Sequence, residues 1–202
     1  MKKHLHLLFA AAGLALLAGC ATKPTTASVS KPYKVVAYKP RDPNAVKVKV
    51  STSTQNVYVV EGDRVLMAVQ GCVGTPQTPT PAGSFRITNK IKNKRRISQP
   101  GAGYPMGYWC EFKPAYGFHE GFVHPVPRTH GCIRLHREAA ARLFALVKPG
   151  TPVYIASTQP EDATAGRTVQ PLDQSRDPNP PMSALMSPSW FQDPEGPLLI
   201  EG

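Results

Sequence analysis

"PRTHGCIRLHREAA", residues 127–140, places Cys132 directly after His130 and Gly131 and just before a helix-forming run. Four roles are open to this cysteine: nucleophile, metal ligand, disulfide partner or buried side chain. Unpaired cysteine is among the most buried residue types and usually packs without reacting. The rest of the sequence must therefore supply the reason to assign chemistry to Cys132.

The run that follows, "HREAAARLFALV" (136–147), is rich in Ala, Leu and Arg and predicts one helix. Its apolar residues Ala140, Leu143, Phe144 and Val147 fall on one face, and "PG" (149–150) ends it. The other regular segments read as short strands, including a hairpin across 56–69; they are residues 46–50, 56–69, 83–87, 107–112 and 151–156. These patterns predict a mainly β domain, a sandwich or mixed sheet, with one main helix after Cys132.

The chain divides into four parts by composition. Residues 1–20 have two lysines, a short apolar run and the ending "LAGC", which resembles the lipobox of bacterial lipoproteins with Cys20 as the lipidated residue. Ala21 after it is typical of delivery to the outer membrane. Residues 21–45 are predicted to be a flexible tether, 46–156 a single domain, and 157–202 a proline-rich tail that is largely disordered. The mature protein is thus expected in the cell envelope, anchored to a membrane by a lipid.

Charge is distributed unevenly along the chain, whose net charge is +11. Residues 46–156 carry 15 Lys and Arg against 5 Asp and Glu, whereas residues 157–202 carry 2 against 7. No nucleic-acid motif is recognisable, so nucleic acid is not predicted as a partner. An exported basic domain meets anionic envelope polymers and peptide carboxylates instead.

Three cysteines remain after Cys20, in a compartment where disulfides persist: Cys72, Cys110 and Cys132. Because three is odd, one of them stays unpaired or pairs between chains. A disulfide between Cys72 and Cys110 is left open, since sequence cannot supply its geometry. In "GYWCEF" (107–112), alternation places Cys110 on the inner face with Tyr108 and Phe112.

All four histidines outside residues 1–20 lie near Cys132: His119, His124, His130 and His136. Thiol catalysis requires a thiolate and a base that generates it, which favours a nucleophilic cysteine. A zinc site is the competing interpretation. It is disfavoured because the "HGC" spacing does not match the usual paired ligands.

Two motifs together resemble the L,D-transpeptidases with a YkuD-type catalytic domain. They are "GFHEG" (117–121) and "THGCIR" (129–134), spaced as in the family's shorter form, "MHAGYLPGYPASHGCIRL". Further resemblance lies in "TPTPAGSFRITNK" (78–90), "MGYWCEF" (106–112) and "GTPVYI" (150–155). The resemblance covers nearly all of residues 46–156 and implies a YkuD-like fold.

The resemblance implies that Cys132 is the nucleophile and His119 its general base. The backbone carbonyl of Glu120 would hold the imidazole in its working tautomer, and amide groups around Gly131 and Cys132 would form the oxyanion hole. Three residues depart from the family pattern, and one of them is His124, which stands where a proline or an apolar residue is usual. Glu120 stands where a small residue is usual, so its carboxylate either raises the pKa of His119 or reaches solvent. Gly107 replaces a usual proline.

Other site residues carry weaker expectations from the same resemblance. His130 would support the turn or line the pocket, and Arg134 would orient a substrate carboxylate or form a structural ion pair. Thr129, in place of the commoner serine, would hydrogen-bond locally near the substrate. Tyr108 would form a pocket wall or donor.

The implied reaction acts on peptidoglycan tetrapeptide stems and requires no metal or organic cofactor. Cys132 would attack the carbonyl of the third stem residue and expel the terminal D-alanine as a thioester forms. A stem amine would then give a 3→3 crosslink, a protein lysine would give protein attachment, and water would give carboxypeptidase activity.

Two alternative functions are a non-catalytic peptidoglycan-binding lipoprotein and a papain-like endopeptidase. Chain order argues against the second alternative, because His119 precedes Cys132.

Overall fold

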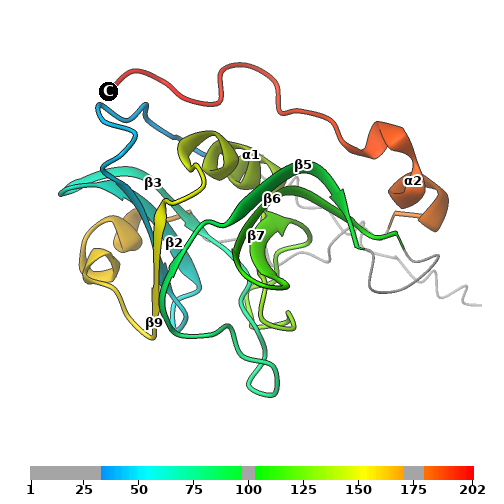
Figure 1. Ribbon diagram of the computed structural model, residues 1–202, viewed down its shortest axis with the longest axis horizontal. Coiled ribbons are helices and arrows are strands. Elements are labelled where there is room, and N and C mark those ends of the chain that lie inside the picture. The colour runs from blue at the N-terminus through cyan, green and yellow to red at the C-terminus, as the bar shows by residue number, and fades with distance from the viewer. Residues whose placement is uncertain (1–32, 97–102, 171–179) are drawn as a thin grey trace, which may run out of the picture.

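Two β-sheets form the frame of the protein (Figure 1). The computed structural model describes residues 33–96, 103–170 and 180–202. The first sheet has the strand order β3-β2-β1-β9-β4 and the second the order β5-β6-β7-β8. Their bounds are β1 Val46–Ser51, β2 Asn56–Glu61, β3 Arg64–Gln70, β4 Gly83–Arg86, β5 Asn89–Arg95, β6 Pro105–Lys113, β7 Tyr116–Glu120, β8 Ile133–Leu135 and β9 Pro152–Ala156. The predicted mainly β fold is confirmed.

Alternating side chains build the first sheet. In β1, Val46, Val48 and Val50 are buried while Lys47 is exposed, the pattern of a strand with one face in the core. β2 and β3 form the expected hairpin, and Gly62 in their turn has a φ of 58°, a left-handed conformation that favours glycine. β9 lies parallel to β1, so the end of the predicted domain closes against its beginning.

One helix, α1 (Arg137–Leu146), follows β8 as predicted and packs on β6, β7 and β8. Ala140 and Leu143 on its inner face are buried, and Phe144 meets Tyr108 of β6 with ring centroids 5.9 Å apart. The core joins this helix to both sheets (Figure 1). The helix therefore holds the β6-β7-β8 layer in place from its inner side.

The segment before β1 belongs to the folded domain from Tyr33 onward. Tyr33 stacks on His136 with ring centroids 4.6 Å apart, Ala37 is buried, and Tyr38 forms a parallel bridge with Ile200. The tether predicted for residues 21–45 is therefore wrong over 33–45. Cys20 and the predicted signal segment lie outside the described residues, as do 21–32. Across the described ranges, no helix has the length and apolar character needed to span a membrane.

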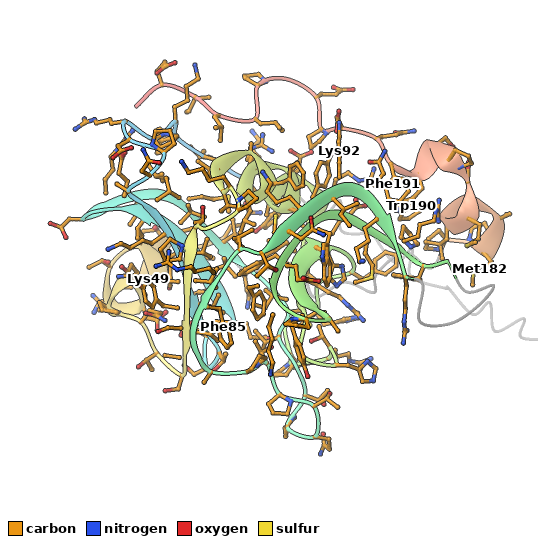
Figure 2. All side chains as sticks on the ribbon, viewed as in Figure 1. Lys49, Phe85, Lys92, Met182, Trp190 and Phe191 are labelled. Carbon is orange, nitrogen blue, oxygen red and sulfur yellow. The ribbon has the colours of Figure 1, made fainter. Side chains whose placement is uncertain are left out.

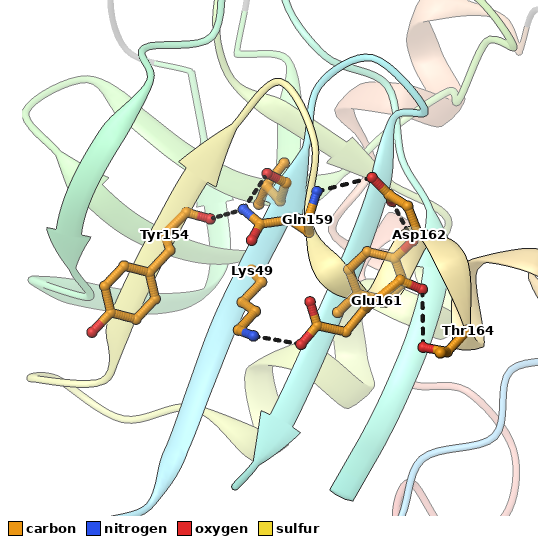
Figure 3. Close-up of polar contacts among 8 residues, drawn as sticks. Lys49, Tyr154, Gln159, Glu161, Asp162 and Thr164 are labelled. Atoms are coloured by element: carbon orange, nitrogen blue, oxygen red, sulfur yellow. Dashed lines mark hydrogen bonds and ion pairs between the residues drawn. The ribbon is translucent and has the colours of Figure 1, made fainter. Parts of the chain in front are cut away.

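The first part of the C-terminal tail docks on the first sheet through two short 3-10 helices, η1 (Pro160–Ala163) and η2 (Ala165–Thr168). The Asp162 carboxylate accepts hydrogen bonds from Ser51 Oγ and Tyr58 Oη, both at 2.7 Å. Beside it, Lys49 pairs with Glu161 (Figure 3). Residues 157–170 are thus folded, contrary to the prediction of a largely disordered tail.

The last part of the tail, residues 180–202, lies across the α1 side of the molecule (Figure 1). It contains α2 (Met182–Met186) and the 3-10 helix η3 (Pro188–Trp190). Arg95 of β5 donates to the carbonyl oxygens of Leu185 and Ser187, each at 2.9 Å, and Lys92 pairs with Asp193 at 2.7 Å. Figure 2 labels Lys92 on β5 and Trp190 and Phe191 in the tail. The acidic tail therefore docks through ion pairs with the basic domain, while residues 171–179 lie outside the described part.

Candidate active site

The two motif residues come together because β7 and β8 are adjacent parallel strands. His119 is in register with Arg134, and Phe118 with Ile133. Side chains in register on parallel strands face the same way, so His119 and Arg134 share a face and Cys132 continues that face beside Gly117. Strand spacing and rise place the Cα atoms of His119 and Cys132 about 8 Å apart, within reach of the two side chains.

The turn that presents Cys132 depends on glycine and on a buried hydroxyl. Gly131 has a φ of 107°, and a Cβ there would lie 2.5 Å from Cε1 of Tyr116. Thr129 Oγ1 accepts from the N–H of Gly131 at 3.0 Å and donates to the carbonyl of Cys132 at 2.6 Å. Thr129 is 2% exposed, and its hydroxyl forms the expected local hydrogen bonds, which fix the turn. A role of Thr129 in binding substrate stays a prediction.

These contacts also concern the predicted oxyanion hole. The N–H of Gly131 donates to Thr129 Oγ1 in this structure, so the expectation that it serves an oxyanion stays a prediction. The N–H of Cys132 has no acceptor among the described residues. It is the donor left for a negatively charged oxygen at this position.

His119 carries its ring proton on Nδ1, the nitrogen that faces the backbone carbonyl of Glu120. Its Nδ1 lies 2.6 Å from the carbonyl oxygen of Glu120, and because a carbonyl only accepts, Nδ1 is the donor and Nε2 keeps a free lone pair. Burial lowers the pKa of His119 to about 4, with the charge of Arg134 adding to the shift and the Glu120 carbonyl opposing it. The imidazole is therefore neutral at pH 7.

The Cys132 thiol is also neutral at rest. Burial raises the pKa of Cys132, although the backbone of Gly117 and the charges of Arg134, Lys94 and Arg96 pull it down. Its Sγ donates weakly to the Ala115 carbonyl at 3.6 Å. A thiol of raised pKa beside an imidazole of lowered pKa does not form a resting thiolate–imidazolium pair. If this thiol were to act as a nucleophile, a base would have to remove its proton during the attack.

This neutral pair predicts an unusual pH dependence for kcat/KM. The acid limb should follow protonation of His119 and therefore fall near pH 4, with a flat profile through neutral pH. Alkylation of Cys132 by iodoacetamide in the resting protein should be slow at pH 7 and rise only at alkaline pH. Both profiles can be measured on the same preparation. An acid limb near pH 6.5, or fast alkylation at pH 6, would contradict the neutral pair.

The side chain of Glu120 points away from His119. It pairs with Arg137 at the start of α1, with Oε1 2.8 Å from Nη2, and it is buried. It neither reaches solvent nor acts on the histidine, which corrects both expectations. A Cβ at Gly107 would lie 2.6 Å from Oε2 of Glu120. The departures at Glu120 and Gly107 are therefore one adjustment, because the glycine makes room for the carboxylate.

Removing one partner of this buried pair should destabilise the protein more than removing both. Burial raises the pKa of Glu120, and Arg137 opposes the shift. We expect Arg137→Met to lower the free energy of unfolding by about 3 kcal/mol, because the Glu120 carboxylate would remain buried without a cation. Adding Glu120→Gln should restore part of that loss. Urea denaturation of both variants at pH 7 tests this, and a double variant less stable than the single one would refute the explanation.

Tyr108, expected at the pocket, lies on the opposite face of β6. Its ring packs on Phe144 and its hydroxyl donates to the Asp193 carboxylate at 2.6 Å. Its φ is 55°, so the chain bends there in a conformation rare for a large residue. Tyr108 therefore anchors the tail, and its assignment as a pocket wall is wrong.

The remaining histidines do not join the pair. His130 is exposed on the turn, and His136 precedes α1 beside Tyr33. Within the described ranges, no three His, Cys, Asp or Glu side chains gather into a metal-binding group. Arg134 keeps its place on the same face as Cys132, and it has no carboxylate partner among the described residues.

The disulfide left open between Cys72 and Cys110 is absent, since both are free thiols. Cys110 is in register with Phe118, Phe118 with Ile133, and the backbone of Cys72 bridges Arg134 on the far side of β8. Three strand spacings separate the two cysteines by roughly 14 Å. A disulfide requires Cα atoms about 6 Å apart.

Trp109 is a site residue that the sequence reasoning missed. Its ring centroid lies 6.0 Å from that of His119, and Lys94 Nζ lies 4.9 Å from the Trp109 ring. The ring packs on Gly117, where a Cβ would approach Cζ2 and Cη2 to 2.9 Å. The signal was present in "GYWCEF", because alternation places Trp109 opposite the inward-facing Cys110.

Two β-sheets, with a neutral histidine on β7 and a cysteine just before the neighbouring β8, define the class of fold and site to which the chain is compared. The chain belongs to the L,D-transpeptidases: the YkuD L,D-transpeptidase catalytic domain matches residues 45–155.

Related proteins agree with this membership. The chain is 32% identical over 123 residues to the YkuD protein of Bacillus licheniformis, which carries an L,D-transpeptidase name, covering 57% of this chain and 69% of that one. The YkuD protein of Bacillus subtilis is 32% identical over 114 residues, covering 54% and 64%. The fold is similar to the crystal structure of an L,D-transpeptidase from Stackebrandtia nassauensis, with a TM-score of 0.51, 20% identity and coverage of 61% and 60%.

Proposed function

We propose that this protein is a cysteine-dependent L,D-transpeptidase acting on peptidoglycan stem peptides. The observation that carries the proposal is the hydrogen bond from His119 Nδ1 to the Glu120 carbonyl. It leaves Nε2 as a base on the face that also bears Cys132, in a chain of this family. The short spacing between "GFHEG" and "THGCIR" further supports the shorter-spaced branch.

In the proposed acylation step, the Cys132 thiol transfers its proton to Nε2 of His119 as sulfur bonds to the carbonyl carbon of the third stem residue. The N–H of Cys132 stabilises the oxyanion. His119 then gives the proton to the nitrogen of the departing D-alanine, and the C–N bond breaks. The product is a thioester on Cys132, and no cofactor takes part.

Deacylation reverses these roles. His119 removes a proton from the incoming nucleophile, which attacks the thioester and releases the thiol. A stem amine gives a 3→3 crosslink, a protein lysine gives a protein–peptidoglycan bond, and water gives a tripeptide. Arg134 is proposed to orient a substrate carboxylate, because it lies beside His119 with no carboxylate partner in the described part of the chain.

We further propose that Cys20 carries a lipid that anchors the protein in the outer membrane, facing the periplasm. The ending "LAGC" and the following Ala21 support this. Residues 21–32, part of the predicted tether, lie outside the described residues, and the domain matched over 45–155 would be the catalytic part.

Product identification tests the proposal. The full-length protein is incubated with a purified tetrapeptide muropeptide, and products are resolved by mass spectrometry. We expect D-alanine release together with a 3→3 dimer, a tripeptide or a protein adduct, and a carbapenem should label Cys132. Saturable binding to sacculi without D-alanine release would instead support the non-catalytic peptidoglycan-binding alternative.

A further inference from the structure

The indole N–H of Trp109 is buried near His119 and has no hydrogen-bond acceptor among the described residues. Trp109 is 2% exposed, and its Nε1 has no partner. Leaving such a donor unsatisfied in the interior costs free energy, so an unsatisfied group in a site indicates a ligand that supplies the acceptor. No part of the mechanism above uses this donor.

The ring of Trp109 lies over Gly117 of the neighbouring strand β7. Cζ2 and Cη2 of Trp109 lie over Gly117, and Cζ2 is bonded to the carbon that carries Nε1. Gly117 is the residue whose backbone contacts the Cys132 sulfur. The N–H edge of Trp109, Gly117 and the thiol therefore follow one another across β6, β7 and β8.

A cation lies over the same ring. Lys94 Nζ is 4.9 Å from the centroid of Trp109, and Lys94 is half-buried. On the same strand, Lys92 has a carboxylate partner in Asp193, but Lys94 has none among the described residues. The charge of Lys94 also reaches Cys132, where it opposes the rise in the thiol pKa.

We propose that Trp109 Nε1 and Lys94 Nζ form a subsite beside Cys132 that binds a carboxylate of the acyl-donor peptide. Two donors, one of them cationic, match an anionic oxygen ligand. In a stem tetrapeptide the carboxylate comes from one of two sources: the terminal carboxylate of the departing residue or the side-chain carboxylate of the third residue. The inference rests on the proposed function for the identity of this peptide.

An alkylation experiment tests the subsite without requiring turnover. Iodoacetate and iodoacetamide modify the same thiol and differ in carrying a carboxylate or an amide. For Cys132, followed by peptide mass spectrometry, we expect Lys94→Met and Trp109→Phe each to lower the ratio of iodoacetate to iodoacetamide rates about tenfold. Lys47→Met, an exposed lysine on β1, should leave it unchanged. A ratio in Lys94→Met within twofold of wild type would overturn the proposal.

Substrate analogues identify the source of the carboxylate. Tetrapeptides amidated at the terminal carboxyl or at the side chain of the third residue are compared with the parent peptide. Amidation of the bound carboxylate should lower kcat/KM of the wild type about tenfold and change that of Lys94→Met little. Equal penalties in both proteins at both positions would overturn the subsite. Absence of turnover with all peptides would refute the transpeptidase function, and the alkylation ratio would still decide the subsite.

Discussion

Cys132→Ala is expected to abolish release of D-alanine from a tetrapeptide stem, with a loss in kcat of about 10⁴-fold or more. The residual rate should be small because a thioester cannot form without the sulfur. The fold should be unaffected, since the thiol makes only weak contacts, with the Ala115 carbonyl at 3.6 Å and with the backbone of Gly117. Liquid chromatography of muropeptides before and after incubation measures the effect.

Cys72→Ala is the matched control for this variant. Cys72 is also a free thiol, but its Sγ contacts the carbonyl oxygen of Val126 at 3.4 Å and it belongs to a second buried cluster with Val123. Turnover should persist in this control. D-alanine release that survives in Cys132→Ala would disprove the thioester mechanism.

The strands that sequence reasoning found share one property, a face of apolar residues in the core. β1 and the hairpin of β2 and β3 show it directly. β5 has the sequence "NKIKNKR" and only one large apolar residue, Ile91, so periodicity cannot reveal it. It is held by pairing with β6 and by contacts such as Lys90 Nζ over the Phe144 ring at 4.1 Å. Such contacts depend on residues distant in sequence.

β7 and β8 escaped prediction for a different reason. They are short, and their composition reflects chemistry more than burial, since β7 carries His119 and β8 carries Arg134. The resemblance to a family identified both motifs, but only the parallel register shows that the two side chains share a face. The two motifs could therefore be identified from the sequence, but their position on one face of the sheet follows only from the strand topology.

The predictions for the site were wrong where a single backbone angle, or a partner distant in sequence, determines the position of a side chain. The φ of 55° at Tyr108 and the carboxylate of Asp193 together fix that side chain on the tail side of β6. The tail itself was predicted to be disordered from its prolines. Composition does not show that Asp162 and Asp193 each have a docking partner on the domain.

His119→Gln should lower kcat about 10³-fold, because glutamine cannot accept the thiol proton as a base. A second consequence follows from the pKa of His119, about 4 in the folded protein and about 6.5 in the unfolded chain. The unfolded chain binds the proton more tightly, so protonation stabilises the unfolded state relative to the folded state as the pH drops. The wild type should have its full stability above pH 6.5 and lose about 3 kcal/mol of it as the pH falls to 4.

The glutamine variant lacks this titration, so its free energy of unfolding should fall less between pH 7 and pH 4.5 than that of the wild type. Urea denaturation at the two pH values measures the difference, and activity at pH 7 measures the loss of the base. His130→Gln is the matched control, because His130 is exposed on the turn and its replacement removes no buried imidazole. It should behave as the wild type in both measurements. Equal losses of stability in His119→Gln and the wild type on acidification would show that His119 is not a neutral buried base. That result would also contradict the proposed acylation step, which depends on the tautomer of His119.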